Sequence, residues 1–384
     1  MKNKKAKRIV GLGLLLLALW PAAAHAQGGH VWVSTVVDSE GFVGQHASLA
    51  LTNGGSPCIS YFSSNDGGSL KYACRTGSNW QAETVDSGNV GWSTSLALDA
   101  ADHPHISYYR YTTSLKYAYH DGATWHIETV ESYGGRFGEF NDLALDAAGH
   151  PHIAYTESGT NWQVLRYAYH DGSTWHKETV DGLGDADVGS YVSLALDGDD
   201  HPHLSYQDDT NLDLRYAYYD GSAWHTETVE AEGDTGYHTS LALDSDGHPH
   251  IAYVNGDESV KYAYHDGSAW HIETVGAAWV VAAYPSLALD GNDRPHIAYG
   301  RYMCVWDCTG RLIYNVRDGA AWQTEIADEG TGLKFTFLSL ALDGYDQPHI
   351  AYCEDENDDL RYVFGLSSSR LTHQVYLPLV VRTP

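Results

Sequence analysis

The sequence is poor in basic residues, and after its first 26 residues it has no long apolar run. Its 384 residues include 22 Lys and Arg against 50 Asp and Glu, which gives a formal net charge of −28. A surface this acidic repels nucleic acid and anionic membranes, so we exclude both as partners. No segment after residue 26 has the length and apolarity of a membrane-spanning helix. We therefore expect a folded domain without a membrane span.

The first 26 residues, in contrast, have the three parts of a secretory signal peptide. Residues 2–8 are basic, residues 9–20 are apolar, and residues 24–26 read Ala-His-Ala. This pattern predicts cleavage before Gln27 and an exported, extracellular protein. We expect residues 27–365 to form the folded domain and residues 366–384 to form a spacer and a tail, to which we assign no role.

Helical periodicity is absent from the rest of the chain, which consists of one unit repeated seven times. The unit reads Ser-Leu-Ala-Leu-Asp, a turn, Pro-His-Ile-Ala-Tyr, a variable loop, Leu-Lys-Tyr-Ala-Tyr, Asp-Gly and Trp-His-x-Glu-Thr-Val. Its first Leu recurs every 46 to 53 residues, at Leu49, Leu96, Leu143, Leu194, Leu241, Leu287 and Leu340. Each unit contains four short β-type runs bounded by Gly, Asp and Pro. Units of this length with four strands predict the blades of an all-β, seven-bladed β-propeller.

The seventh unit lacks its fourth strand, and the N-terminus supplies a matching segment. Residues 32–38 read Trp-Val-Ser-Thr-Val-Val-Asp, in register with the missing run. We predict that this first strand completes the last four-stranded antiparallel blade and closes the ring. Closure would protect strand edges that an open array exposes.

With these repeats, the chain resembles secreted bacterial seven-bladed β-propellers, both the sialidase-like repeat group and the propeller lectins. The resemblance covers roughly residues 30–365 and implies a secreted propeller that binds glycans. Sialidases carry an Asp-box, Ser-x-Asp-x-Gly-x-x-Trp. The equivalent turn here, residues 170–175, reads His-Asp-Gly-Ser-Thr-Trp, with Asp and Gly adjacent. Sialidase chemistry is therefore not implied.

The five cysteines are an odd number, so at least one has no partner within the chain. Cys58 and Cys74 replace repeat residues at facing positions of two antiparallel strands, and Cys304 and Cys308 lie in one long loop. We predict a disulfide in each pair, as export permits, and a free Cys353.

Most histidines belong to the repeat and therefore to the scaffold. Seventeen of the 22 His occupy repeat positions. The recurring His-Pro-His could chelate zinc, but its copies lie in different blades and cannot converge on one ion. Asp244 to Gly247 resemble a calcium loop, yet the equivalent turns lack the ligands. We expect no metal and no cofactor.

Loop length divides the predicted ring into two faces. The turns between strands one and two, and between three and four, are nearly constant and define the constant-turn face. The other loops carry the insertions, in residues 131–141, 181–192, 300–311 and 327–337, and define the variable-loop face. Repeat proteins usually bind with their individual face. Non-repeat Trp and Arg fall in these loops, and we select Trp92, Trp279, Arg110, Arg136 and Arg301 as candidate ligand-binding residues. The alternative is that these aromatic residues only pack the loops.

A second candidate set surrounds the predicted axis, two residues before the repeat Ser. Six of the seven residues at this position carry rings: His46, Phe140, Tyr191, His238, Tyr284 and Phe337. These rings would surround the mouth of the channel, where they would bind ligand or plug it. Asp142 replaces the repeat Ser in blade three only and would place a single carboxylate beside them.

The features above favour a secreted, monomeric propeller that binds glycan or polysaccharide without catalysis. One alternative is a carbohydrate-active enzyme, either a lyase with a Tyr or His base and an Arg on a uronate, or a hydrolase. A hydrolase would need two carboxylates, for which Asp142 with Glu139 or Glu157 is the candidate cluster. The other alternative is a platform that binds extracellular protein at the cell surface.

Overall fold

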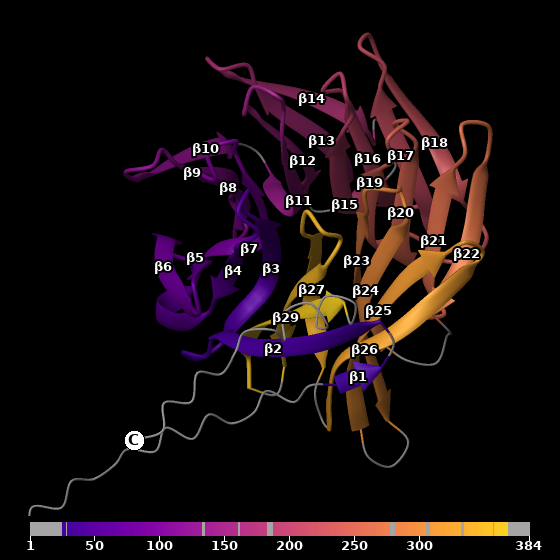
Figure 1. The fold of residues 1–384 in the computed structure, drawn as a ribbon. Coiled ribbons are helices and arrows are strands. Elements are labelled where there is room, and N and C mark those ends of the chain that lie inside the picture. Colours follow the sequence, from indigo (N-terminus) through magenta and orange to yellow (C-terminus); the bar gives the residue numbers. More distant parts are fainter. Residues whose placement is uncertain are drawn as a thin grey trace, which may run out of the picture.

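The computed structural model describes residues 25–27, 29–132, 135–159, 162–182, 187–276, 281–304, 308–331, 334–355 and 357–367. These residues form seven antiparallel sheets, six of four strands and one of five, arranged as blades around a ring (Figure 1). The predicted seven-bladed all-β propeller is confirmed. The helical content within this part of the chain is one short 3-10 turn, Asn65–Gly67, and no helix there is long and apolar enough to cross a membrane.

Blades one to three contain, in order, β3 (Val43–Leu51), β4 (Pro57–Ser63), β5 (Ser69–Thr76) and β6 (Asn79–Ser87); β7 (Val90–Leu98), β8 (Pro104–Arg110), β9 (Ser114–His120) and β10 (Trp125–Glu131); and β11 (Arg136–Leu145), β12 (Pro151–Ser158), β13 (Gln163–His170) and β14 (Trp175–Asp181). Blades four to six contain β15 (Val188–Leu196), β16 (Pro202–Asp208), β17 (Asp213–Tyr219) and β18 (Trp224–Glu230); β19 (Tyr237–Leu243), β20 (Pro249–Val254), β21 (Val260–His265) and β22 (Trp270–Gly276); and β23 (Val281–Leu289), β24 (Pro295–Cys304), β25 (Cys308–Asp318) and β26 (Ala321–Thr331). Blade seven contains β27 (Phe335–Leu342), β28 (Pro348–Glu354), β29 (Asp359–Ser367), β2 (His30–Asp38) and β1 (His25–Gln27).

The N-terminal strand closes the ring as predicted. β2 pairs antiparallel with β29, with Trp32 opposite Gly365, and the sheet order is β1-β2-β29-β28-β27. Figure 1 shows the indigo β2 beside the yellow β29, so the two ends of the domain share one blade. The short β1 pairs with the start of β2 and spans the boundary at residues 26 and 27. Cleavage there, and the role of the tail, stay predictions.

The order of strands within a blade explains their burial. The first strand of every blade lies innermost, and the seven inner strands contact one another in sequence around the axis. The second strand of each blade is buried along most or all of its length, as in β4 and β16, because neighbouring blades cover both of its faces. The apolar Pro-His-Ile-Ala-Tyr run fits this doubly buried position.

A repeated hydrogen bond at the axis joins each blade to the next. The repeat Ser of one inner strand accepts from the backbone N–H of the repeat Leu in the following blade, as in Leu96 N to Ser48 Oγ at 3.0 Å. The same link occurs at all seven blade junctions, with acceptor and donor pairs Ser48–Leu96, Ser95–Leu143, Asp142–Leu194, Ser193–Leu241, Ser240–Leu287, Ser286–Leu340 and Ser339–Leu49. The small repeat Ser is therefore a connector between blades.

A second link joins the blades at their outer edge. The fourth-strand Trp donates its indole N–H to the Glu of the preceding blade, as in Trp175 to Glu128 at 2.9 Å. Trp32 makes this bond to Glu325 and is fully buried, whereas the other fourth-strand Trp side chains are half-buried. These six side chains pack against the blade cores but stay partly exposed, because the outer strand is open to solvent on one side.

The cysteines behave as predicted where their side chains are described. Cys58 and Cys74 face each other across β4 and β5 and form a disulfide. Cys353 is free and buried, with its thiol against the carbonyl of Val43 in the neighbouring blade. The backbones of Cys304 and Cys308 also pair, but their side chains lie outside the described residues, so a disulfide there stays a prediction.

We predict that Trp32→Ala destabilises the whole ring. Trp32 packs against Tyr314 and Leu312 of blade six as well as against its own blade, so its loss opens the closing seam. A buried Trp to Ala change typically costs about 3–5 kcal/mol. Urea unfolding followed by both fluorescence and circular dichroism should give one cooperative transition at a lower midpoint.

Trp80→Ala is the matched control for this variant. Trp80 is the equivalent residue of blade one, but it is half-buried, and Thr35 replaces the Glu that would accept its indole N–H. Trp80→Ala should therefore lower the free energy of unfolding by clearly less than Trp32→Ala does. Equal losses in the two variants, or a separate transition for one blade, would contradict the role of the N-terminal strand in closure.

Candidate functional site

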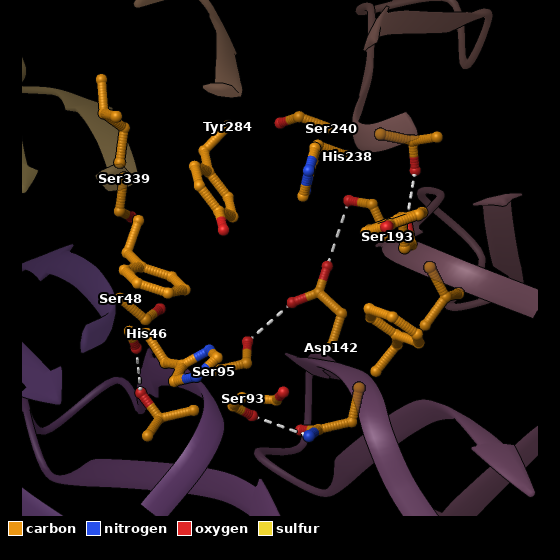
Figure 2. A pocket seen from close by; sticks show the side chains of 18 of the residues that line it. His46, Ser48, Ser93, Ser95, Asp142, Ser193, His238, Ser240, Tyr284 and Ser339 are labelled. Atoms are coloured by element: carbon orange, nitrogen blue, oxygen red, sulfur yellow. Dashed lines mark hydrogen bonds between the residues drawn. The ribbon is translucent and has the colours of Figure 1, made fainter. Parts of the chain in front are cut away.

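A cavity of about 450 Å³ lies on the axis, inside the ring of inner strands. Every blade contributes residues to its wall, and they come from the same two or three consecutive positions of each first strand. Figure 2 shows the side chains of Tyr284, His238 and Asp142 directed at one common space. The cavity is therefore a product of the repeat, but its lining differs from blade to blade.

The predicted axial side chains meet around this cavity as a nearly continuous aromatic ring. Each neighbours the next with ring centroids 4.3 to 4.7 Å apart, in the order Phe140, Tyr191, His238, Tyr284, Phe337 and His46. We call these six side chains the axial aromatic ring. All six are half-buried, since one side of each packs on its neighbours and the other faces the cavity. Only blade two, with Ser93, lacks an aromatic side chain at this position.

A bulge in the inner strand aims these side chains at the axis. The register between strands one and two shifts at this point, for example between Gln45 and Ser48 in blade one. His46, Ser93, Tyr191, His238, Tyr284 and Phe337 all have a left-handed backbone, with φ between 46° and 56°. Bulky residues seldom adopt this conformation, and bulges commonly redirect side chains next to binding sites.

Polar residues next to the bulge hold its carbonyl groups. Thr94 Oγ1 donates to the carbonyl of His46 at 2.9 Å, Thr239 to that of Tyr191 at 2.7 Å, and Asn141 Nδ2 to that of Ser93 at 2.7 Å. We did not single out these residues from the sequence. Their shared position, one residue after the ring position, was the available signal.

The two ring histidines are neutral at physiological pH. Burial lowers the pKa of His46 and of His238 to about 4, and no described carboxylate lies close enough to oppose the shift. Burial raises the pKa of Tyr191 to about 12 and also raises that of Tyr284. The aromatic ring therefore presents uncharged hydrogen-bonding groups to the cavity.

Asp142 lies below the ring, where its carboxylate joins three blades. Oδ1 accepts from Ser95 Oγ at 2.6 Å, and Oδ2 accepts from Leu194 N at 2.8 Å and from Ser193 Oγ at 3.1 Å. Burial raises its pKa, while these hydrogen bonds act in the opposite direction. The carboxylate thus takes over the connecting role of the repeat Ser.

The predicted hydrolase pair does not form a matched set of free carboxylates. Glu157 lies in β12 and pairs with Arg166, at 3.4 Å between Oε2 and Nε. Glu139 is exposed and precedes Phe140, while Asp142 is engaged by its four donors. Asp142 lines the cavity, whereas Glu139 and Glu157 are not among its lining residues.

The candidate residues of the loops are more dispersed. Trp92 is half-buried and packs on Phe62, at 4.4 Å between ring centroids, and on Tyr111 at 5.6 Å. Arg110 and Arg136 are exposed, and Arg301 is half-buried. Trp279 lies outside the described residues. Tyr111 was missed, although it is a non-repeat aromatic residue directly after Arg110.

The repeated histidines have structural partners. His105 lies between Tyr117, whose hydroxyl is 2.5 Å from Nδ1, and Asp99, and the other five Pro-His residues repeat this arrangement. His103 contacts the same Asp99 carboxylate. Within the described part of the chain, no group of three or more His, Cys, Asp or Glu side chains could hold a metal ion.

Comparison with known proteins shows that this chain is similar in fold to several solved structures. The chain is similar to an ulvan lyase of polysaccharide lyase family 25, with 13% identity, a TM-score of 0.62, and coverage of 90% of this chain and 98% of that one. It is also similar to a lectin from Aleuria aurantia, with 13% identity, a TM-score of 0.52 and coverage of 73% and 94%. AofleA from Arthrobotrys oligospora has 14% identity, a TM-score of 0.51 and coverage of 78% and 92%. No protein-family model and no curated protein matches the sequence.

The role of Asp142 leads to a first prediction for the site. Asp142→Ala leaves the N–H of Leu194 without its acceptor, and we expect a loss of about 1–3 kcal/mol in unfolding free energy. Asp142→Ser restores the link found in the other blades and should recover most of that loss. Denaturant unfolding of both variants tests this. Equal instability of the two would show that the carboxylate does more than connect blades.

The buried histidines lead to a second prediction, on pH. Because their folded pKa of about 4 lies below the ordinary value of 6.5, the folded state binds fewer protons than the unfolded state. Their contribution to stability is complete above pH 6.5 and is lost as the pH falls towards 4. Replacing both by Phe, the residue of blades three and seven, should reduce the acid-induced fall in melting temperature. An unchanged fall would contradict the lowered pKa of the two histidines.

Proposed function

We propose that this protein is an extracellular glycan-binding propeller without catalytic activity, and that glycan binds in the axial cavity on the variable-loop side. One observation carries the proposal, namely the axial aromatic ring around a cavity of about 450 Å³. Cavities of this size accommodate small ligands, and apolar walls with a few polar groups are their usual lining.

The chemistry of the ring suits a sugar. Aromatic faces provide flat apolar surface for the C–H side of a pyranose, and the hydroxyls of Tyr191 and Tyr284 provide polar handles. The neutral His46 and His238 can each donate or accept a hydrogen bond, as sugar hydroxyls require. The cost of ordering the binding residues is low, because the ring side chains already pack on one another.

Two structural neighbours add support from outside the chain. The lectin from Aleuria aurantia was solved in complex with Fucα1-6GlcNAc, and the ulvan lyase was solved bound to -[GlcA(1-4)Rha3S]-. Both proteins engage carbohydrate on a comparable fold. Function differs widely among proteins of one fold, so this support is an analogy that stands beside the site chemistry.

Export also belongs to this proposal. The signal-peptide pattern of residues 1–26 predicts it, and the Cys58–Cys74 disulfide is the kind of bond that persists in an oxidising compartment. We propose a bacterial secreted protein that acts as a monomer.

A polysaccharide lyase is the second candidate. His238 and Tyr284 lie 4.3 Å apart between ring centroids and face the cavity together, a pair that could abstract and return a proton. Incubation with uronate polysaccharides, followed by ultraviolet absorbance of unsaturated products, separates the candidates. We expect no increase in absorbance, and a sustained increase that His238→Phe abolishes would favour the lyase.

A glycan array on the purified protein tests the binding function, and Tyr191→Ala tests its location. Truncating a central aromatic residue of a binding site typically costs about 2 kcal/mol, or about thirtyfold in affinity. Tyr191→Ala should therefore weaken binding of the array's best glycan by that amount in titration calorimetry.

His248→Ala is the control on the constant-turn face, where His248 is half-buried beside Asp244. It should leave affinity unchanged. A loss of affinity in His248→Ala but not in Tyr191→Ala would place the functional face on the constant turns. Binding of no glycan at all would contradict the proposed function itself.

A further inference from the structure

The axial aromatic ring has one gap, and the gap lies in blade two. His46 and Phe140 are the two ends of the aromatic series, and Ser93 stands between them. Its hydroxyl donates to the carbonyl of Glu139, so the small side chain is held against blade three. Bulky residues adopt the same left-handed backbone in five other blades, as Phe337 does at φ 51° against 46° for Ser93. The backbone therefore permits an aromatic side chain here, and blade two has none.

An aromatic path leads outward from this gap. His46 contacts Trp92 at 5.6 Å between centroids, and Trp92 contacts Tyr111 at 5.6 Å. Trp92 is fixed from behind by Phe62 at 4.4 Å, and its indole N–H donates to Asn89 at 3.3 Å. The side chain of Tyr111 is 51% exposed on the variable-loop face. The cavity wall thus continues as a series of rings over blades one and two.

Two cations that form no ion pair within the described part of the chain lie in β8 and β11, on either side of this path. Ten of the described Lys and Arg side chains form ion pairs, and Arg110 and Arg136 are not among them. Arg110 directly precedes Tyr111, and Arg136 begins the segment that leads through Glu139 to Phe140. The charges of Glu139 and Arg136 both act on Tyr109, the residue that precedes Arg110. The two exposed guanidinium groups would pair with carboxylate or sulfate groups of a ligand at this place, against the repulsion that the net charge of −28 exerts over the rest of the surface.

We infer that the ligand is an acidic polysaccharide, one end of which occupies the axial cavity while the chain leaves through the gap at Ser93 and lies along Trp92 and Tyr111, beside Arg110 and Arg136. This inference rests on the proposed glycan-binding function and adds the direction of the glycan, its extension beyond the cavity and its charge. A series of rings at sugar-residue spacing holds successive residues of a chain, whereas a closed aromatic ring would admit only a terminal sugar.

The test uses the whole folded protein and defined acidic glycans. Polygalacturonate, alginate, heparin and ulvan are titrated, each beside a neutral form that is carboxyl-reduced and, where it carries sulfate, desulfated. Fragments of the tightest binder, from disaccharide to octasaccharide, are then compared. We expect the neutral form to bind at least about tenfold more weakly, and the affinity to rise with length by about tenfold or more.

Three variants assign these effects to the gap. Ser93→Phe completes the aromatic ring and should remove the gain in affinity with length. Tyr111→Ala should reduce that gain, and Arg110→Gln should reduce both the preference for the acidic form and its dependence on salt. Tyr345→Ala, whose side chain is 66% exposed on the constant-turn face, is the matched control and should change none of these quantities. The melting temperature of Ser93→Phe checks that it folds.

The outcomes separate the inference from the proposed function. Equal affinity for the acidic and neutral forms overturns the assigned charge. A length gain that persists in Ser93→Phe and Tyr111→Ala, or the absence of any gain, overturns the assigned path. In each of these cases, the proposed axial site still stands if Tyr191→Ala weakens glycan binding. Failure of every glycan in the panel and on the array overturns both proposals.

Discussion

The hydrogen bond from the repeat Leu N–H to the repeat Ser of the preceding blade is the interaction on which the rest of the structure depends. It occurs at all seven junctions, with Asp142 as the acceptor at one of them, and it sets the distance between inner strands around the axis. A side chain much larger than Ser or Asp at this position would fill the centre or separate the blades. Because the side chains at the repeat Ser position are small and nearly constant, the side chains two residues earlier can differ from blade to blade and still surround an open cavity. The outer Trp–Glu bonds and the N-terminal strand complete the same closure at larger radius.

The variable layer differs from its scaffold in both conformation and chemistry. A left-handed bulge recurs there in six blades, and a bulky side chain in that conformation is unfavourable unless surrounding contacts stabilise it. Hydrogen bonds from Thr94, Thr239 and Asn141 to the neighbouring carbonyls supply part of that stabilisation. The resulting wall is aromatic and uncharged, because burial lowers the pKa of both ring histidines. The anionic character of the molecule is thereby kept away from the centre, where only the bridging carboxylate of Asp142 remains.

Much of this architecture could be predicted because each blade repeats the same physical solution. The seven units, the N-terminal strand of the last blade and the Cys58–Cys74 bond follow from repeat spacing and register, and strand alternation places the six ring residues around one axis. Other features depend on distances that the sequence does not contain. The bulge is a register shift within each blade, whereas three of the four hydrogen bonds of Asp142 and the packing of Trp92 on Phe62 arise from contacts between different blades.

The central claim is that a glycan binds inside the axial aromatic ring, and a crystal structure of the protein with the tightest glycan from the array tests it most directly. The account predicts density for a sugar residue in the cavity, stacked on Tyr191 or Tyr284 and hydrogen-bonded to His238, on the variable-loop side of Asp142. A glycan bound at the outer edge between blades, or on the constant-turn face, with an empty axial cavity, would contradict it.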